Sequence, residues 1–99
     1  MTGIPDGWHS TVRRLKRDMP APLPVSIRTK KYIPGRLGHC WKKGNRFFIE
    51  IEQGCEECMY RTLVHEYSHL FDWHDGIKEH SESWGCWFAR AYQVVFETD

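Results

Sequence analysis

The chain has no long hydrophobic run, no internal repeat and no low-complexity segment. Its apolar stretches fall far short of the roughly 20 residues that a helix needs to cross a bilayer. The segment from Met1 to Asp18 is too polar to contain the apolar core of a secretion signal. We therefore expect no membrane association and a cytoplasmic location. At 99 residues, the chain is expected to form a single domain over residues 1–99, and we expect a monomer.

Cysteine is also sparse, with only four residues: Cys40, Cys55, Cys58 and Cys86. An even number of cysteines in a short chain can indicate disulfides, but no export signal supports an oxidising compartment. The C-x-x-C spacing of Cys55 and Cys58 has no second pair that would complete a metal site. We therefore expect four reduced thiols.

The chain lacks a strong overall charge, since its net charge is only +1. The charges are nevertheless unevenly distributed, with a net charge of +8 up to Glu50 and −7 over the rest of the chain. Such asymmetry can indicate a nucleic-acid surface on the first half. No nucleic-acid recognition motif accompanies it, and attraction between the two halves is the simpler interpretation. We expect at most weak, non-specific nucleic-acid contact.

Hydrophobic periodicity and turn residues predict an α+β fold. It consists of an N-terminal helix, a small three-stranded sheet, an active-site helix and a C-terminal helix. Lys43-Gly44-Asn45 is expected to join the last two strands as a hairpin turn. In chain order, the predicted elements are a helix over Ser10–Met19, strands over Val25–Lys31, His39–Lys42 and Arg46–Glu52, a helix from Glu56 to about Trp73, and a helix over Ser81–Phe96.

The motif His65-Glu66-Tyr67-Ser68-His69 lies within the first of the two later helices. Histidines at positions i and i+4 of a helix project from one face and can bind one zinc ion together. Glu66, between them, is then placed to act as a general base beside the metal. Shuffling this composition gives H-E-x-x-H in roughly 3% of sequences, so composition alone explains the motif poorly. The alternative is a solvated helix that carries two histidines by chance.

A catalytic zinc normally has three protein ligands and one open position, so His65 and His69 need a partner. Asp75 has the third-ligand offset of metzincins, but Asp72 stands where that family's glycine would be. His74, only five residues after His69, would be rotated away from the ligand face. His80 is better placed. A break in the helix at Asp75-Gly76 would let the chain turn and bring the His80 imidazole back to the metal. The candidates considered are His74, Asp75, Glu79, His80 and Glu82.

Two segments together resemble SprT-like zinc metallopeptidases and small phage or prophage proteins of that type. They are Thr62–His69, which contains the H-E-x-x-H motif, and His80–Tyr92, which resembles the H-G-x-x-[FW] helix opening of that family. The resemblance implies a minimal zincin fold with zinc ligands His65, His69 and His80, the general base Glu66, and Trp84 packed behind the third ligand. The chain departs from the family pattern at Ser81, where glycine is usual.

The resemblance implies a zinc-dependent metallopeptidase that hydrolyses peptide bonds in a peptide or protein substrate. Strand Arg46–Glu52, just before the active-site helix, resembles the zincin edge strand that receives an extended peptide, and it contains no proline. Tyr67, His74 and Tyr92 are possible stabilisers of the developing oxyanion. Asp72, Glu79 and Glu82 are available to orient an imidazole. The alternative is a zinc-stabilised binding module that docks on nucleic acid or a nucleoprotein through its basic first half.

Overall fold

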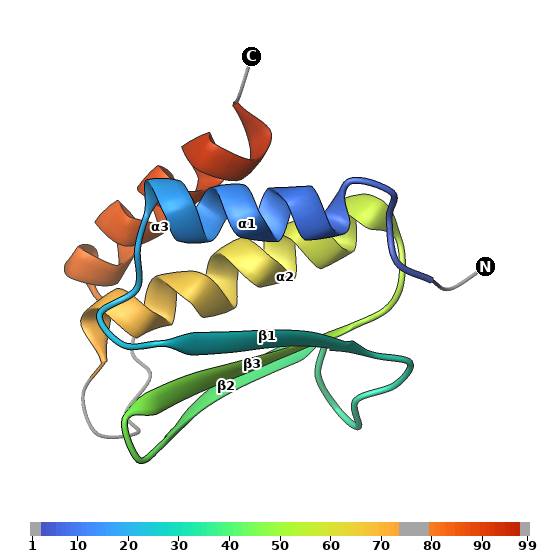
Figure 1. Ribbon diagram of the computed structural model, residues 1–99, viewed down its shortest axis with the longest axis horizontal. Helices are drawn as coiled ribbons and strands as arrows, with labels where there is room; N and C mark the ends of the chain where they lie inside the picture. The colour runs from blue at the N-terminus through green and yellow to red at the C-terminus, as the bar shows by residue number, and fades with distance from the viewer. Residues whose placement is uncertain (1–2, 74–79, 98–99) are drawn as a thin grey trace.

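The predicted α+β order is confirmed by a computed structural model of the chain, which describes residues 3–73 and 80–97. An N-terminal helix precedes a three-stranded mixed sheet, and two helices follow the sheet (Figure 1). In chain order the elements are α1 (Trp8–Asp18), β1 (Val25–Lys30), β2 (Gly38–Lys43), β3 (Arg46–Glu52), α2 (Glu56–His69), the 3₁₀ helix η1 (Leu70–Asp72) and α3 (Glu82–Phe96).

The sheet has the strand order β1-β3-β2, so β3 lies in the centre. It pairs in parallel with β1, Val25 opposite Phe47, and antiparallel with β2, Cys40 opposite Ile49. The prediction that Arg46–Glu52 is an edge strand is therefore wrong. The prediction rested on the position of the strand in the sequence, whereas β3 is buried along most of its length, as a central strand requires. Lys42 and Lys43 instead mark β2 as an edge.

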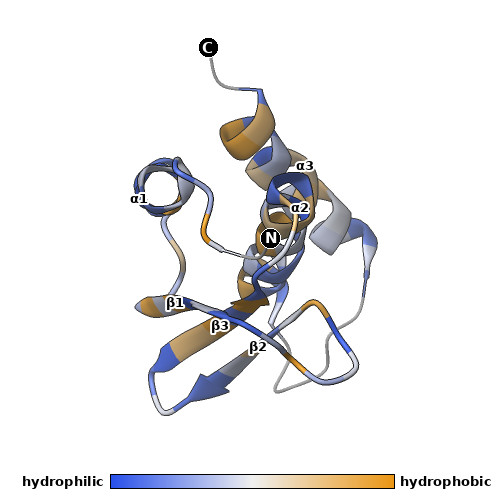
Figure 2. Ribbon diagram, turned by 90° about the vertical axis from the view of Figure 1, so that its right-hand side faces the viewer, coloured by the Kyte–Doolittle hydropathy of each residue, from blue (hydrophilic) through white to orange (hydrophobic). Residues whose placement is uncertain are grey.

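All three α-helices lie on the same side of the sheet, as Figures 1 and 2 show from two directions. The side chains of β3 alternate accordingly: Phe47, Ile49 and Ile51 face the helices and are at most 2% exposed. They join the apolar sides of α1 and α2 in one core, which includes the fully buried Leu15 and Leu63. The core thus holds α2 rigidly against the sheet.

Local signals account for several element boundaries. Gly44 adopts φ +62° in the turn between β2 and β3, a conformation that favours glycine, so the predicted hairpin is confirmed. The helix α1 ends at Asp18, just before the proline-rich stretch that begins at Pro20. The helix α2 ends at His69 and continues as η1 to Asp72, close to the expected end near Trp73.

The expectation of four reduced thiols is wrong for two of the cysteines. Cys55 and Cys58 form a disulfide at the start of α2, where their Cα atoms are 5.2 Å apart. Cys40, in the core, and Cys86, on the surface, remain reduced. The prediction rested on the lack of an export signal and of a second cysteine pair for a metal site. It did not consider that a C-x-x-C segment at the start of a helix brings its two side chains close enough for a disulfide.

No helix in the described part of the chain is both long enough and apolar enough to span a membrane.

Candidate metal centre

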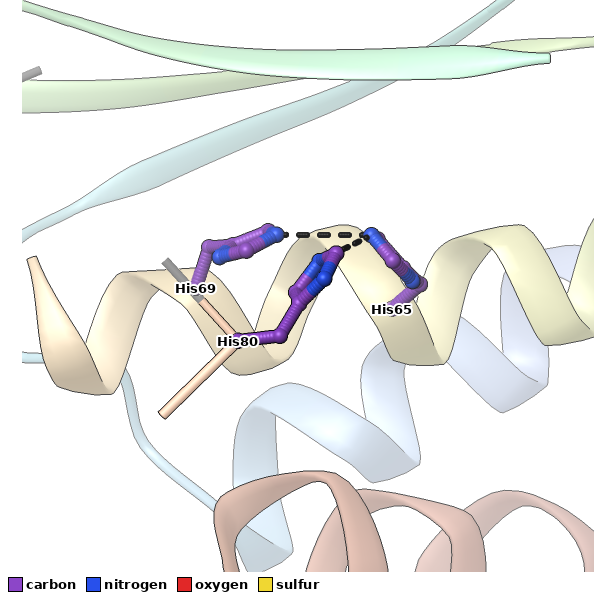
Figure 3. Close-up of side chains that lie close together, drawn as sticks. All are labelled: His65, His69 and His80. Atoms are coloured by element: carbon purple, nitrogen blue, oxygen red, sulfur yellow. Dashed lines mark hydrogen bonds between the residues drawn. The ribbon is translucent and has the colours of Figure 1, made fainter. Parts of the chain in front are cut away.

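Three histidines from two segments meet at one point above α2 (Figure 3). His65 and His69 project from α2, and His80 lies just before α3. The Nε2 atom of His65 is 3.4 Å from Nε2 of His69 and 3.2 Å from Nε2 of His80. Within residues 3–73 and 80–97, this is the one cluster of three or more histidine, cysteine or acidic side chains whose ligand atoms converge in this way.

The spacing of these nitrogens fits a shared metal ion. Zinc–nitrogen bonds are about 2.0–2.1 Å long, and tetrahedral angles then separate two ligand nitrogens by about 3.3–3.4 Å. The two measured separations, 3.4 Å and 3.2 Å, are close to this value. Three imidazoles bind zinc well and leave a fourth position open. The triad could therefore hold a metal ion.

Of the other candidates for the third ligand, Glu82 lies in the described part of the chain, and it is not part of this cluster. Glu82 is exposed in the first turn of α3, where a carboxylate suits the positive end of the helix dipole. His74, Asp75, Glu79 and the expected break at Gly76 lie outside the described residues.

Trp84 packs against the whole triad from the first turn of α3. Its ring centroid lies 4.4 Å from that of His80, 5.2 Å from that of His65 and 5.5 Å from that of His69. An aromatic ring in this place restricts the rotation of all three imidazoles and removes water from one side of the cluster. The expected packing of Trp84 against His80 is thus observed, and Trp84 packs against His65 and His69 as well.

A clamp between Asp72 and Ser81 holds the segment that carries His80, and the sequence analysis did not recognise it. Ser81 Oγ donates a hydrogen bond of 2.5 Å to Asp72 Oδ2, and it accepts one of 3.1 Å from the backbone N–H of Trp84. Ser81 is therefore the N-cap of α3 and also a link to the end of η1. This link connects the residue that follows His80 to the end of η1. The serine at the start of α3 was the local sequence signal of this N-cap.

Glu66 lies beside the triad with only 8% of its surface exposed. Its Oε2 atom is 3.9 Å from Nε2 of His65, one of the converging nitrogens. An open groove of about 340 Å³ reaches His65 and Glu66 along α2 and the beginning of β2. The groove is lined by Leu37, Gly38, Arg61, Thr62, His65 and Glu66.

Gly38 allows the edge strand β2 to approach α2 at this groove. A Cβ atom at Gly38 would lie 2.5 Å from Thr62 Cγ2 and 3.1 Å from the carbonyl oxygen of Glu50. Such contacts are too short for any larger residue without displacement of the strand. The glycine thus sets the distance between the strand and the helix that carries the motif.

The two expected oxyanion stabilisers that the structure describes, Tyr67 and Tyr92, serve packing roles. Tyr67 is fully buried, and its hydroxyl donates a hydrogen bond of 2.6 Å to the carbonyl oxygen of Met19, so it serves the core. Burial also raises the pKa of the Tyr67 phenol far above its ordinary value. Tyr92 packs between Phe88 and Phe96 along α3. His74 lies outside the described residues.

Comparison with known proteins adds no assignment. No family model matches the chain, and neither a curated protein nor a solved structure matches it. The interpretation of the site therefore rests on the residues and geometry described above.

The clamp leads to a first prediction. Replacement of Asp72 by alanine should lower the zinc affinity about tenfold, because loss of support around a ligand typically weakens metal binding 10- to 100-fold. Glu82→Ala is the matched control, since it removes an exposed carboxylate that takes no part in the hydrogen bond between Ser81 and Asp72. Competition with a chromophoric chelator measures both affinities, and circular dichroism verifies the helices. Equal affinities in the two variants would show that the clamp does not position His80.

Proposed function

We propose that the protein is a zinc-dependent metallopeptidase with the ligands His65, His69 and His80. The observation that carries the proposal is the convergence of three Nε2 atoms next to a buried carboxylate at the end of a groove. A zinc ion held there would supply Lewis acidity, which makes water more acidic and polarises a carbonyl group.

Glu66 is the proton carrier in this proposal. Its carboxylate is close to the metal-facing nitrogen of His65, yet it follows His65 directly on the helix and belongs to no ligand cluster. It is therefore placed to accept a proton from the attacking water and to return it to the leaving amine. Its low exposure keeps bulk water from competing for that role.

The edge strand β2 replaces β3 as the proposed support for an extended substrate. Its side away from β3 has no strand partner in the described part of the chain. The same strand borders the groove at Gly38, opposite Thr62, His65 and Glu66 of α2. A peptide that pairs with the main chain of β2 would therefore pass in front of Glu66 and the triad.

A second prediction tests the enzyme directly. The zinc-loaded Glu66→Gln variant should bind zinc as the wild type does and lose peptide hydrolysis by about 10²- to 10⁴-fold, the usual contribution of a general base. Digestion of an unfolded protein such as casein, followed by mass spectrometry of the fragments, measures the activity.

Glu56→Gln is the control for this experiment, because Glu56 is an exposed carboxylate in the first turn of the same helix. It should retain full activity. Turnover by Glu66→Gln at the wild-type rate would contradict the assignment of the base and point to a contaminating protease.

Nucleic-acid docking is the second candidate function, and the open face of the sheet favours it. On the face away from the helices, Trp41 of β2 stacks on Phe48 of β3 with ring centroids 5.4 Å apart. Basic side chains surround this pair, together with two acids, Glu50 and Glu52. His39 and Lys30 hold the pKa of Glu50 below its usual range, and Glu52 accepts a hydrogen bond from the backbone N–H of Ile33. The basic residues of this face are Arg28, Lys30, Lys43 and Arg46.

Stacked aromatic side chains with surrounding cations are typical of surfaces that bind single strands without sequence preference. A third prediction is that Trp41→Ala weakens single-strand binding about 5- to 100-fold, since one stacked base contributes about 1–3 kcal/mol. The wild-type affinity should stay in the range of about 10⁻⁴ to 10⁻⁶ M at physiological salt.

Trp87→Ala is the matched control, because Trp87 is an exposed tryptophan of α3 rather than of the sheet. Fluorescence anisotropy of a labelled oligonucleotide, repeated at several salt concentrations, measures both variants. An unchanged affinity in Trp41→Ala would exclude the sheet face as the binding surface.

A further inference from the structure

The Cys55–Cys58 disulfide is not part of the metal centre, and it occupies the first turn of the same helix. Both cysteines are exposed, so their sulfur atoms are accessible to other molecules. The disulfide links residues only three positions apart. Because the stabilisation given by a disulfide grows with the length of the loop it closes, this one contributes little as a structural crosslink. An exposed disulfide at this position is better suited to thiol–disulfide exchange than to structural stabilisation.

The two sulfurs differ in their surroundings. Cys55 is the N-cap of α2, and its Sγ accepts a hydrogen bond of 3.1 Å from the backbone N–H of Cys58. If Cys55 is reduced, the same N–H and the positive end of the helix dipole stabilise its thiolate. Glu56 and Glu57 in the first turn oppose this effect, and Arg61 pairs with Glu57 at 3.1 Å. Cys58 lies inside the helix, so Cys55 is the better nucleophile of the pair.

From this asymmetry, we propose that Cys55 and Cys58 form a thiol–disulfide exchange site that reacts with dithiol reductants through Cys55. The inference is independent of the proposed peptidase activity. It also accounts for a C-x-x-C pair that no metal cluster of the described residues uses.

The exchange proceeds in two balanced steps. A thiolate of the reductant attacks Sγ of Cys55, a mixed disulfide forms, and Cys58 leaves as a thiolate that takes up a proton. The second thiol of the reductant then attacks the first sulfur of the reductant in the mixed disulfide and releases Cys55. The chain gains two electrons and two protons, and the dithiol becomes a cyclic disulfide. The reverse reaction lets reduced Cys55 attack an external disulfide.

The helix should survive the exchange. The N–H of Cys58 can donate to Cys55 Sγ in either redox state, and Thr62 Oγ1 donates a hydrogen bond of 2.7 Å to the carbonyl oxygen of Cys58 in the next turn. The metal-binding part of α2 begins at His65, two turns beyond Cys58. Reduction is thus expected to proceed in the folded protein without loss of the helix.

The first test uses the full chain with Cys86→Ser, which removes the exposed single thiol, while Cys40 stays buried at 2% exposure. The oxidised protein is treated with dithiothreitol at pH 7 without denaturant, and thiols are counted by alkylation and mass spectrometry. We expect two additional thiols per chain and an unchanged helical circular dichroism signal. Reduction that occurs only in denaturant, or only with loss of the helices, would overturn the proposal.

The second test compares Cys55→Ser with Cys58→Ser, each in the Cys86→Ser background, so that one exchange-site cysteine remains in each protein. Serine keeps an N-cap at position 55, so both variants should fold. With 5,5′-dithiobis(2-nitrobenzoate) at pH 7, Cys55 should react about tenfold faster than Cys58, because thiolate stabilisation governs the reaction. The difference should disappear in denaturant. Equal rates in the folded proteins, or a faster Cys58, would overturn the assignment of Cys55.

Discussion

The arrangement of the site depends on the packing of α2 against α3, which places Nε2 of His69 and Nε2 of His80 at 3.4 Å and 3.2 Å from Nε2 of His65. Imidazole nitrogens at these distances either form a hydrogen bond between neighbouring rings or share a cation. The Trp84 ring and the link from Ser81 to Asp72 hold the rings in this arrangement. Such preorganisation of side chains is typical of a binding site.

The sheet and the core make this arrangement rigid. Buried residues of β3 and α2 hold the motif helix in register with the sheet, and Gly38 lets the edge strand β2 approach it at the groove. The same helix carries a disulfide at its start, borders a groove along its middle and bears two histidines of the candidate metal centre near its end. It contacts α3 near both ends, through Tyr60 and Phe96 close to the disulfide and through Trp84 at the triad.

Local features of the sequence were sufficient to predict the helices, the strands and the pairing of His65 with His69, since periodicity and i,i+4 spacing are properties of short segments. His80 was added from the expected turn before it and from the family resemblance. The prediction that β3 is an edge strand was wrong because pairing partners are not encoded in any one strand. The disulfide was missed because the compartment and the lack of a second cysteine pair were considered instead of helix geometry. The Asp72–Ser81 clamp joins two elements across the break between them. No single-segment pattern reports such a contact.

Metal analysis of the purified protein tests the central claim most directly. Inductively coupled plasma mass spectrometry should find one zinc per chain in wild-type protein purified without chelators, and well under half an equivalent in His80→Ala. His9→Ala, which alters an exposed histidine of α1, should keep the wild-type content. A wild-type protein without zinc, or full zinc content in His80→Ala, would contradict the assignment of the three histidines as a metal centre.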